Sequence, residues 1–554
     1  MSEIEQDKLD AATTPRGLSR RHFIQGVAAT GVGAGLLGLA ACGGDDTTTE
    51  EAVTEETTAE VAQGGTLRVG GGKVANAPTP FTTNDQGSLQ VLCCVGEYLM
   101  WNNDKGELEP RIAESWESTD GGTTWTIKIR QGVTFHDGSP LTADDVVYSI
   151  TAHLDEANAS TQAGTFAGVF EAAGVTKVDD STVQIVCLAP TGALPNLISS
   201  TTYGLIMIKN GEAAGEGWQS TMNGCGPWVL NTYTEGDRTT FTRNDAYWDT
   251  NRIPAFDALE LIQFDSADAA VAQLTAGEID AVVAKINPAT AAAVDANVVE
   301  LVRVTSASHL MVHMRNDFGP FQDKRIRKAA ALTLARADYL SGVLLGEGVL
   351  GNDSIIDAYP TLKDTSVPQR EIDLEAAKAL MEEAGVADGF DVDLSSYSRD
   401  DINLLAPFLK SSLAEIGINV TIKQADSYYT EPWSAQESKK QESNYWLESN
   451  FGITDFGHRG SPDVVLNRVI KSTGDWNAAQ YKSDDMDAAI TAFVTGATPE
   501  DRQAAAKTIQ EIALEDSPYI FLYFDVATGA VRKGLTGVYA NGMAQFESAS
   551  ARNV

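Results

Sequence analysis

A strand pattern runs directly into a helix pattern within residues 125–149, and this order constrains the fold more than any other feature. Residues 125–129 (W-T-I-K-I) alternate apolar and polar side chains, which is the period of a half-buried strand. We expect this strand to turn at Gly132 and to continue through 133–135. Thr142 then stands three residues before an acidic residue, the spacing of a helix capping box, and an apolar helical face follows.

Helix and strand patterns follow one another again far along the chain, here with the helix first. Asp373 precedes apolar residues at helical spacing over 374–384, and Gly385 follows them as a stop signal. Residues 418–422 (I-N-V-T-I) again alternate as a strand. Strands and helices taken in turn predict an α/β fold rather than an all-α or all-β one.

Length and charge narrow the class of protein. The chain has 554 residues, more than one hydrophobic core usually organises, so we expect at least two lobes. Its formal net charge is -37, and such a surface repels a phosphate backbone. We therefore expect no nucleic-acid partner.

The first 63 residues are predicted to lie outside the globular fold. Arg20 and Arg21 precede a short apolar run rich in Gly and Ala, which is typical of a twin-arginine export signal and too short for a stable membrane span. The run ends in small residues before Cys42, resembling the lipobox of bacterial lipoproteins, so we expect a signal over 1–41 and a lipidated Cys42. Residues 43–63 contain seven acidic residues and no basic one, which predicts an extended linker over 42–63.

Several segments share a family resemblance. The stretch W-T-I-K-I-R-Q-G-V-T-F-H-D-G-S-P-L-T-A-D-D-V-V-Y-S (125–149) resembles the signature segment of extracellular solute-binding family 5, the oligopeptide-, dipeptide- and nickel-binding proteins of ABC importers. Further blocks resemble the family in its order: 97–99, 110–117, 224–228, 243–248, 274–280, 373–385 and 416–420. The resemblance covers roughly residues 64–530.

The resemblance implies a two-lobed α/β fold, the type II periplasmic-binding-protein (Venus-flytrap) fold, with an extra subdomain inserted in lobe I. The implied divisions are lobe I over 64–310 with the insertion at about 107–217, lobe II over 311–517, and a C-terminal return to lobe I over 518–554. The apolar runs 310–316 and 517–524 would be the strands that cross between the lobes.

The implied function is that of a substrate-binding lipoprotein of an ABC importer. It would capture a peptide or an amine-bearing small molecule between its lobes and deliver it to permease subunits with their ATPases. We expect a monomer without a cofactor, exported and held at the outer face of the cytoplasmic membrane by a lipid anchor at Cys42. An oligosaccharide or a metal chelate remains an alternative ligand for the same fold.

The resemblance also points to site residues in I-T-D-F-G-H-R-G-S-P-D (453–463). Asp455 falls on the aspartate that pairs with the ligand amine in peptide-binding members, and Thr454 precedes it. Arg459 and His458 are candidates for a ligand carboxylate or hydroxyl groups, although Arg459 could instead pair with Asp463 or Asp455, and His458 has no nucleophile or metal partner nearby in sequence.

Other candidates lie in flanking segments. Arg399 follows a predicted strand and is a second carboxylate ligand candidate, with a solvated loop residue as the alternative. Trp446 and Phe451 are candidates for the apolar wall of the site. Further aromatic residues close by in sequence are Tyr428, Tyr429, Trp433, Tyr445 and Trp476.

A secreted hydrolase is the rival class. The sequence contains neither G-x-S-x-G nor H-E-x-x-H, and its six histidines are scattered. His309 and His313 are four apart, but in a strand that spacing separates them by about 13 Å, too far to share a metal. We therefore expect a binding protein rather than an enzyme. Cys187 and Cys225 are a conceivable disulfide, whereas Cys93 and the adjacent Cys94 suit small buried residues.

Overall fold

The computed structural model describes residues 63–74, 77–212, 216–426, 428–429 and 444–553. All of them belong to one compact unit, Ala59–Val554. The predicted export signal, Cys42 and nearly all of the acidic linker lie outside the described residues. Within the described part of the chain, no helix combines the length and the apolar character needed to cross a bilayer.

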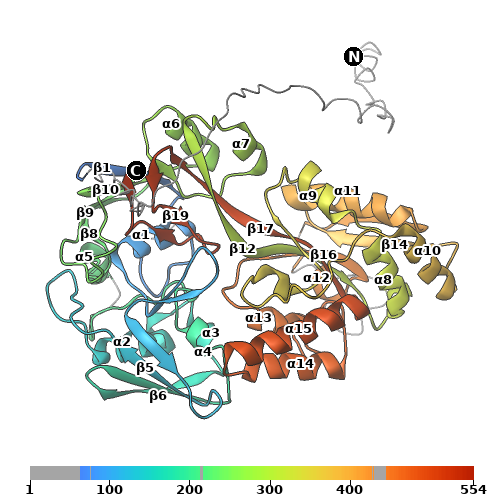
Figure 1. Cartoon of the computed structure of the whole chain (residues 1–554), viewed down its shortest axis with the longest axis horizontal. Coiled ribbons are helices and arrows are strands. Elements are labelled where there is room, and N and C mark those ends of the chain that lie inside the picture. Colours follow the sequence, from blue (N-terminus) through green and yellow to red (C-terminus); the bar gives the residue numbers. More distant parts are fainter. Residues whose placement is uncertain (1–62, 75–76, 213–215, 427, 430–443, 554) are drawn as a thin grey trace, which may run out of the picture. The chain divides into compact units, whose positions relative to one another are not determined.

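An 11-stranded mixed sheet runs through this unit. Its two longest strands, β12 (Val299–Met314) and β17 (Tyr519–Arg532), pair with each other in antiparallel fashion (Figure 1). On one side of this pair lies what we call the N-terminal half-sheet: β11 (Ala281–Val282), β1 (Thr66–Gly71), β10 (Ala258–Gln263), β9 (Arg238–Arg243) and β8 (Trp228–Thr234). On the other side lies the C-terminal half-sheet: β16 (Phe451–Phe456), β14 (Phe390–Ser396) and β15 (Ile418–Gln424).

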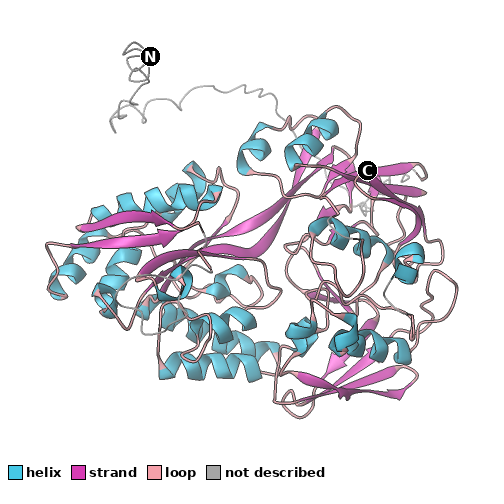
Figure 2. Ribbon diagram, turned by 180° about the vertical axis from the view of Figure 1, so that it is seen from behind, coloured by secondary structure: helices cyan, strands magenta, loops and turns pink. Residues whose placement is uncertain are grey.

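The pair β12 and β17 therefore links the two half-sheets, and Figure 2 shows it as the longest ribbons from behind. The lobe boundary expected near residue 310 falls inside β12, because the first part of this strand, from Val299 to Thr305, already pairs with the second part of β17. Strand β13 (Val349–Leu350) pairs with β17 as well.

The register between β12 and β17 shifts at two places, between Thr305 and His309 and between His309 and Met311. Thr305 pairs with Val526, and the next pair is His309 with Phe524, so residues 306–308 lie opposite Asp525 alone. A bulge of this kind breaks the ladder of backbone hydrogen bonds and bends the strand. We call residues 306–308 the β12 bulge.

A second sheet of four antiparallel strands occupies the part of the chain expected to form the inserted subdomain. Its strand order is β4 (Ala113–Glu117), β5 (Thr124–Ile129), β7 (Thr182–Cys187) and β6 (Phe170–Asp179). The predicted strand at 125–129 is confirmed as β5. Its predicted continuation through 133–135 is wrong: Gly132 has φ +83° and turns the chain, and only an isolated bridge from Thr134 to Pro140 follows.

The predicted helix starts are confirmed. Helix α2 (Ala143–Thr151) begins with a capping box in which the side chain of Asp145 accepts a hydrogen bond from the Thr142 amide at 2.7 Å. Helix α10 (Leu374–Glu383) begins after the N-cap Asp373. The remaining helices are α1 (Gln86–Val95), α3 (Ala163–Phe166), α4 (Leu194–Leu197), α5 (Glu216–Thr221), α6 (Ala267–Thr275), α7 (Pro288–Ala293), α8 (Lys324–Leu332), α9 (Arg336–Gly342), α11 (Asp400–Ala414), α12 (Tyr445–Glu448), α13 (Asp463–Val465), α14 (Asp484–Thr495) and α15 (Pro499–Asp516).

The four described cysteines are buried free thiols. Cys93 and Cys94 lie inside α1 as small apolar residues, as expected. Cys187 and Cys225 belong to the same hydrophobic core but do not form the conceivable disulfide.

Candidate ligand-binding site

Asp455 lies near the end of β16 and is held by three side chains. Its Oδ1 accepts a hydrogen bond from the Tyr429 hydroxyl at 2.5 Å and another from the Tyr397 hydroxyl, which comes from the segment after β14. Its Oδ2 forms an ion pair with Arg399. A carboxylate has about four acceptor positions, and the described side chains occupy three of those of Asp455, which leaves one position on Oδ2 for a further donor.

The environment keeps Asp455 ionised. Burial alone would raise the pKa of Asp455, but the two tyrosine hydroxyls and the Arg399 guanidinium outweigh it, and the pKa is lowered from the ordinary aspartate value. Burial disfavours the charged form of Arg399 too, yet the carboxylates of Asp401 and Asp455 raise its pKa. The site therefore contains a permanent, mutually neutralised pair of charges.

Asp455 needs no ligand amine to avoid an unpaired buried charge, because Arg399 already supplies the opposite charge. Arg399 is no isolated loop residue either, since it also bonds Asp401 at 2.8 Å. The structure brings two of the predicted site residues into direct contact.

A continuous set of aromatic rings adjoins Asp455. The Tyr429 ring lies 5.4 Å from that of Trp446, and the Trp446 ring lies 5.9 Å from that of Trp476. The Phe456 ring lies beside both, 6.5 Å from that of Trp446 and 6.3 Å from that of Trp476. We call Tyr429, Trp446, Phe456 and Trp476 the aromatic wall. Trp433, which we also considered for this role, lies outside the described residues.

The indole Nε1 of Trp446 in this wall is buried and has no hydrogen-bond partner in the described part of the chain. The hydroxyl of Thr454, close to the wall, is buried beside the Tyr428 hydroxyl. An unpaired buried donor costs free energy, so a polar ligand at this place would relieve that cost. Both residues were among the site residues that we predicted from the sequence.

Phe451 occupies a different environment. Its side chain is fully buried in the hydrophobic core of the C-terminal half-sheet, 5.3 Å from the ring of Phe321. In antiparallel pairing, Met314 lies directly opposite Phe451 and belongs to the same core. The side chain stabilises the strand that presents Asp455.

His458 and Arg459 separate in the loop after β16. The His458 ring packs against β12, where its Nδ1 accepts a hydrogen bond from the Ala307 amide at 2.9 Å. The Arg459 guanidinium bonds only the His458 carbonyl, at 3.0 Å, and forms no ion pair with any described residue. Both carboxylates considered as partners of Arg459 pair with other arginines. Asp455 pairs with Arg399, and Asp463 pairs with Arg502 at 2.8 Å.

The two histidines of β12 act as structural residues. Nδ1 of His309 bonds the Ala307 carbonyl at 2.7 Å, and Nε2 of His313 bonds the Ser449 carbonyl at 3.0 Å. Burial lowers the pKa of each to about 4, so both rings are neutral. No cluster of three or more potential metal ligands occurs among the described residues.

A cavity of about 240 Å³ lies beside the β12 bulge. Lys285, which follows β11, and Asp525 of β17 form an ion pair of 2.7 Å in its wall. Sequence reasoning missed these residues because they come from distant segments without a motif. It also missed Tyr397, for which the only signal was its place at the end of a strand, two residues before Arg399.

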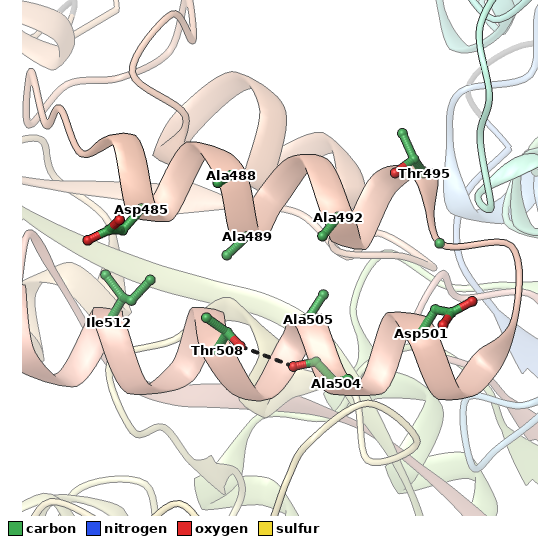
Figure 3. Close-up of a pocket in the computed structure, with 11 residues that line it drawn as sticks. Asp485, Ala488, Ala489, Ala492, Thr495, Asp501, Ala504, Ala505, Thr508 and Ile512 are labelled. Atoms are coloured by element: carbon green, nitrogen blue, oxygen red, sulfur yellow. Dashed lines mark hydrogen bonds between the residues drawn. The ribbon is translucent and has the colours of Figure 1, made fainter.

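A larger hollow of about 860 Å³ lies between α14 and α15 (Figure 3). Alanine side chains, among them Ala488, Ala492 and Ala505, line most of it, and the carboxylates of Asp485 and Asp501 lie toward opposite ends. No set of polar groups converges there, which a specific ligand site requires. The site around Asp455 is therefore the better candidate.

Comparison with known proteins identifies the family of the chain. Residues 107–502 match the family described as bacterial extracellular solute-binding proteins, family 5 Middle. The chain is 27% identical to the oligopeptide-binding protein AppA of Bacillus subtilis, over 90% of this chain and 93% of that protein. It is 26% identical to heme-binding protein A of Haemophilus influenzae, over 88% and 92%.

Solved structures agree on the fold. The periplasmic murein tripeptide binding protein MppA in its unliganded open form superposes with a TM-score of 0.76 at 20% identity, covering 89% of this chain and 98% of that one. AppA of Bacillus subtilis in complex with a nonapeptide gives a TM-score of 0.59 at 22% identity, covering 88% and 98%. The α/β periplasmic-binding-protein fold expected from the sequence is confirmed.

Proposed function

Because the chain belongs to the bacterial extracellular solute-binding proteins of family 5, we propose that it captures a peptide or another amine-bearing solute for an ABC importer. Members of this family bind and deliver solutes rather than transform them, so the secreted hydrolase is set aside. The protein works as a binding protein in the extracellular or periplasmic space.

The open acceptor position on Asp455 is the observation that carries the choice of ligand. A ligand ammonium group is a compact charge with three donors, and it fits a carboxylate whose Oδ1 already accepts from Tyr397 and Tyr429. The ammonium would add to the bond from Arg399 on Oδ2 rather than replace a missing charge. Relatives named for oligopeptide and glutathione binding agree with such a ligand.

The remaining groups suit the rest of a peptide. Arg459 has a guanidinium without an ion-pair partner among the described residues, and its planar fork matches a carboxylate. The aromatic wall offers apolar area for side chains, while the Trp446 indole and the Thr454 hydroxyl offer hydrogen bonds. Asp455, Arg399, Arg459, Trp446 and Thr454 are therefore the proposed ligand-binding residues.

We further propose that Cys42 is acylated and that the acidic linker tethers the protein to the outer face of the cytoplasmic membrane, next to its permease. The order of twin arginine, apolar run and small residues before Cys42 supports this proposal. In cells fed labelled palmitate, the wild-type protein should carry label and Cys42→Ser should not. Equal labelling of both proteins would contradict the anchor.

Native mass spectrometry of the protein as purified tests the ligand. A closed binding protein retains part of its cargo, so we expect a bound mass that fragments into amino acids, and we expect Asp455→Asn to lose it. A protein that releases no nitrogen-containing compound under denaturing conditions, and binds none from a pool of tri- and tetrapeptides, would overturn the proposal.

An oligosaccharide is the second candidate, and the aromatic wall favours it specifically. Indole and phenol rings stack on sugar faces, and Arg399 already neutralises Asp455, so a neutral ligand meets no unpaired charge there. The same mass spectrum decides between the two, because a retained hexose polymer without nitrogen would favour the sugar.

A further inference from the structure

Within the β12 bulge, the backbone amide and carbonyl of Ala307 each form a hydrogen bond with a histidine side chain. The Ala307 amide donates to Nδ1 of His458 at 2.9 Å, and the Ala307 carbonyl accepts from Nδ1 of His309 at 2.7 Å. In an uninterrupted strand both groups would bond neighbouring strands. Here side chains replace the ladder at the point where the two half-sheets are linked.

The His458 ring is enclosed from two further directions. The Ser306 hydroxyl lies 3.2 Å from Nδ1, so this nitrogen faces two donors of the bulge. On another side the ring touches Gly542, where a Cβ atom would overlap Nδ1 and Cε1. The ring therefore lies between the bulge and the C-terminal segment of the chain.

Groups from both half-sheets meet at this place. His458 follows β16 of the C-terminal half-sheet and lies three positions after Asp455. Opposite the bulge, Asp525 pairs with Lys285, which follows β11 of the N-terminal half-sheet, at 2.7 Å. The cavity of about 240 Å³, lined by Ser306 and Ser308, gives the bulge free space on one side.

We propose that His458 is a positioning residue that holds the loop after β16 against the β12 bulge as a neutral ring. The inference rests on the proposed function in one respect, that Arg459 and Asp455 bind the ligand. Through His458 the loop carrying Arg459, and with it the end of β16 carrying Asp455, is held in a defined place on β12.

Only the neutral ring can play this role. Protonation would turn Nδ1 from an acceptor into a donor that faces the Ala307 amide and the Ser306 hydroxyl. Burial and the neighbouring Arg459 charge lower the pKa of His458 to about 4. The bulge residues carry no titratable side chain and the adjacent His309 is neutral. The Asp525 charge is paired with Lys285, and residues 540–544 contain no titratable group.

Histidine NMR on the ligand-free full chain tests the placement of the ring. The resonance absent from His458→Asn identifies His458 in the wild-type spectrum. We expect the His458 ring to stay neutral down to about pH 4, whereas a ring that is free in solvent titrates near 6.5. Titration near 6.5 would overturn the proposal.

Exchange of the Ala307 amide at pH 7.5 tests the role itself. In His458→Asn the side-chain oxygen keeps an acceptor near the position of Nδ1, whereas His458→Leu removes it, so we expect exchange at least about tenfold faster in the Leu variant and close to wild type in the Asn variant. Equal rates in all three proteins would contradict the role of His458.

A second variant changes a neighbour of the His458 ring and leaves the histidine itself in place. Gly542→Ala should displace His458 and speed Ala307 exchange, while Gly164→Ala, at a site with open space around it, should leave the rate unchanged. Unaltered exchange of the Ala307 amide in Gly542→Ala would also contradict the positioning role of His458. These readouts need no ligand, so a failure of peptide binding would overturn the proposed function and leave this test independent.

Discussion

Asp455 is a carboxylate whose acceptor positions are mostly occupied before any ligand arrives. Two tyrosine hydroxyls orient Oδ1, and Arg399 pairs with Oδ2, so the ligand meets a group already ionised and fixed in direction. A preorganised acceptor of this kind reduces the entropy that binding must overcome. Asp455 therefore recognises a ligand through the fixed direction of its acceptor positions more than through an unpaired charge.

Replacing Asp455 with Asn should weaken the binding of an amine-bearing peptide by about 10- to 100-fold, because a charge-assisted hydrogen bond is worth about 1.5–3 kcal/mol. Isothermal titration calorimetry on the purified variant measures this loss. Asp265→Asn removes an exposed carboxylate that pairs with Lys73 and should bind like the wild type. Equal affinities of Asp455→Asn and the wild type would rule out the assigned contact.

Single residues divide into those that sequence can locate and those that need the fold. Asp455 was predicted from the family resemblance and Arg399 from its position after a predicted strand, and the structure brings the two residues into contact. The actual partner of His458 could not be predicted, because it is the backbone of Ala307, 151 positions earlier. The neutralisation of Asp455 by Arg399 was missed for a similar reason, since it depends on how β14 and β16 end beside each other.

The loop after β16 carries Arg459 of the proposed site, and glycines decide how closely this loop packs. At Gly460 a Cβ atom would overlap the side chain of Thr201, which belongs to a distant segment. At Gly457 only the Arg459 side chain lies near such an atom. Gly460 therefore permits a close approach that no other residue type would allow.

Gly460→Ala should lower the free energy of unfolding by about 1–3 kcal/mol through overpacking against Thr201. Adding Thr201→Gly removes the overlapping atoms, so the double variant should recover part of that loss. Denaturant unfolding of the wild type and the three variants gives the coupling between the two positions. Additive losses would contradict the packing described for this loop.

At the scale of elements, sequence patterns predicted helix starts correctly, because a helix start depends on a few adjacent residues. The capping box of α2 and the N-cap of α10 follow from a few adjacent residues, and both are confirmed. The strand expected at 133–135 failed because the left-handed turn at Gly132 ends the pairing. The β12 bulge gave no sequence signal, because it depends on register with β17, more than 200 residues away.

Across the whole molecule, several buried histidines are kept neutral. Burial lowers the pKa of His153, His309 and His313 to about 4 in the folded chain. In the unfolded chain a histidine titrates near 6.5. The unfolded state therefore binds more protons than the folded state between these two values.

Stability should accordingly be full above pH 6.5 and should decline as the pH falls toward 4, by up to about 3 kcal/mol for each of these histidines. Thermal unfolding followed by circular dichroism between pH 7.5 and 4.5 measures the decline. His153→Gln removes one titrating ring, so its unfolding temperature should fall less with acid than that of the wild type. A pH-independent unfolding temperature in this range would contradict the assignment of neutral rings.

The central claim is that this protein recognises a ligand amine through Asp455. The most direct test is calorimetric binding of a tetrapeptide with a free amino terminus and of the same peptide acetylated there. We predict that acetylation weakens binding to the wild type at least about tenfold, and that this difference largely disappears in Asp455→Asn. Equal affinity of the wild type for both peptides, or binding of neither, would contradict the claim.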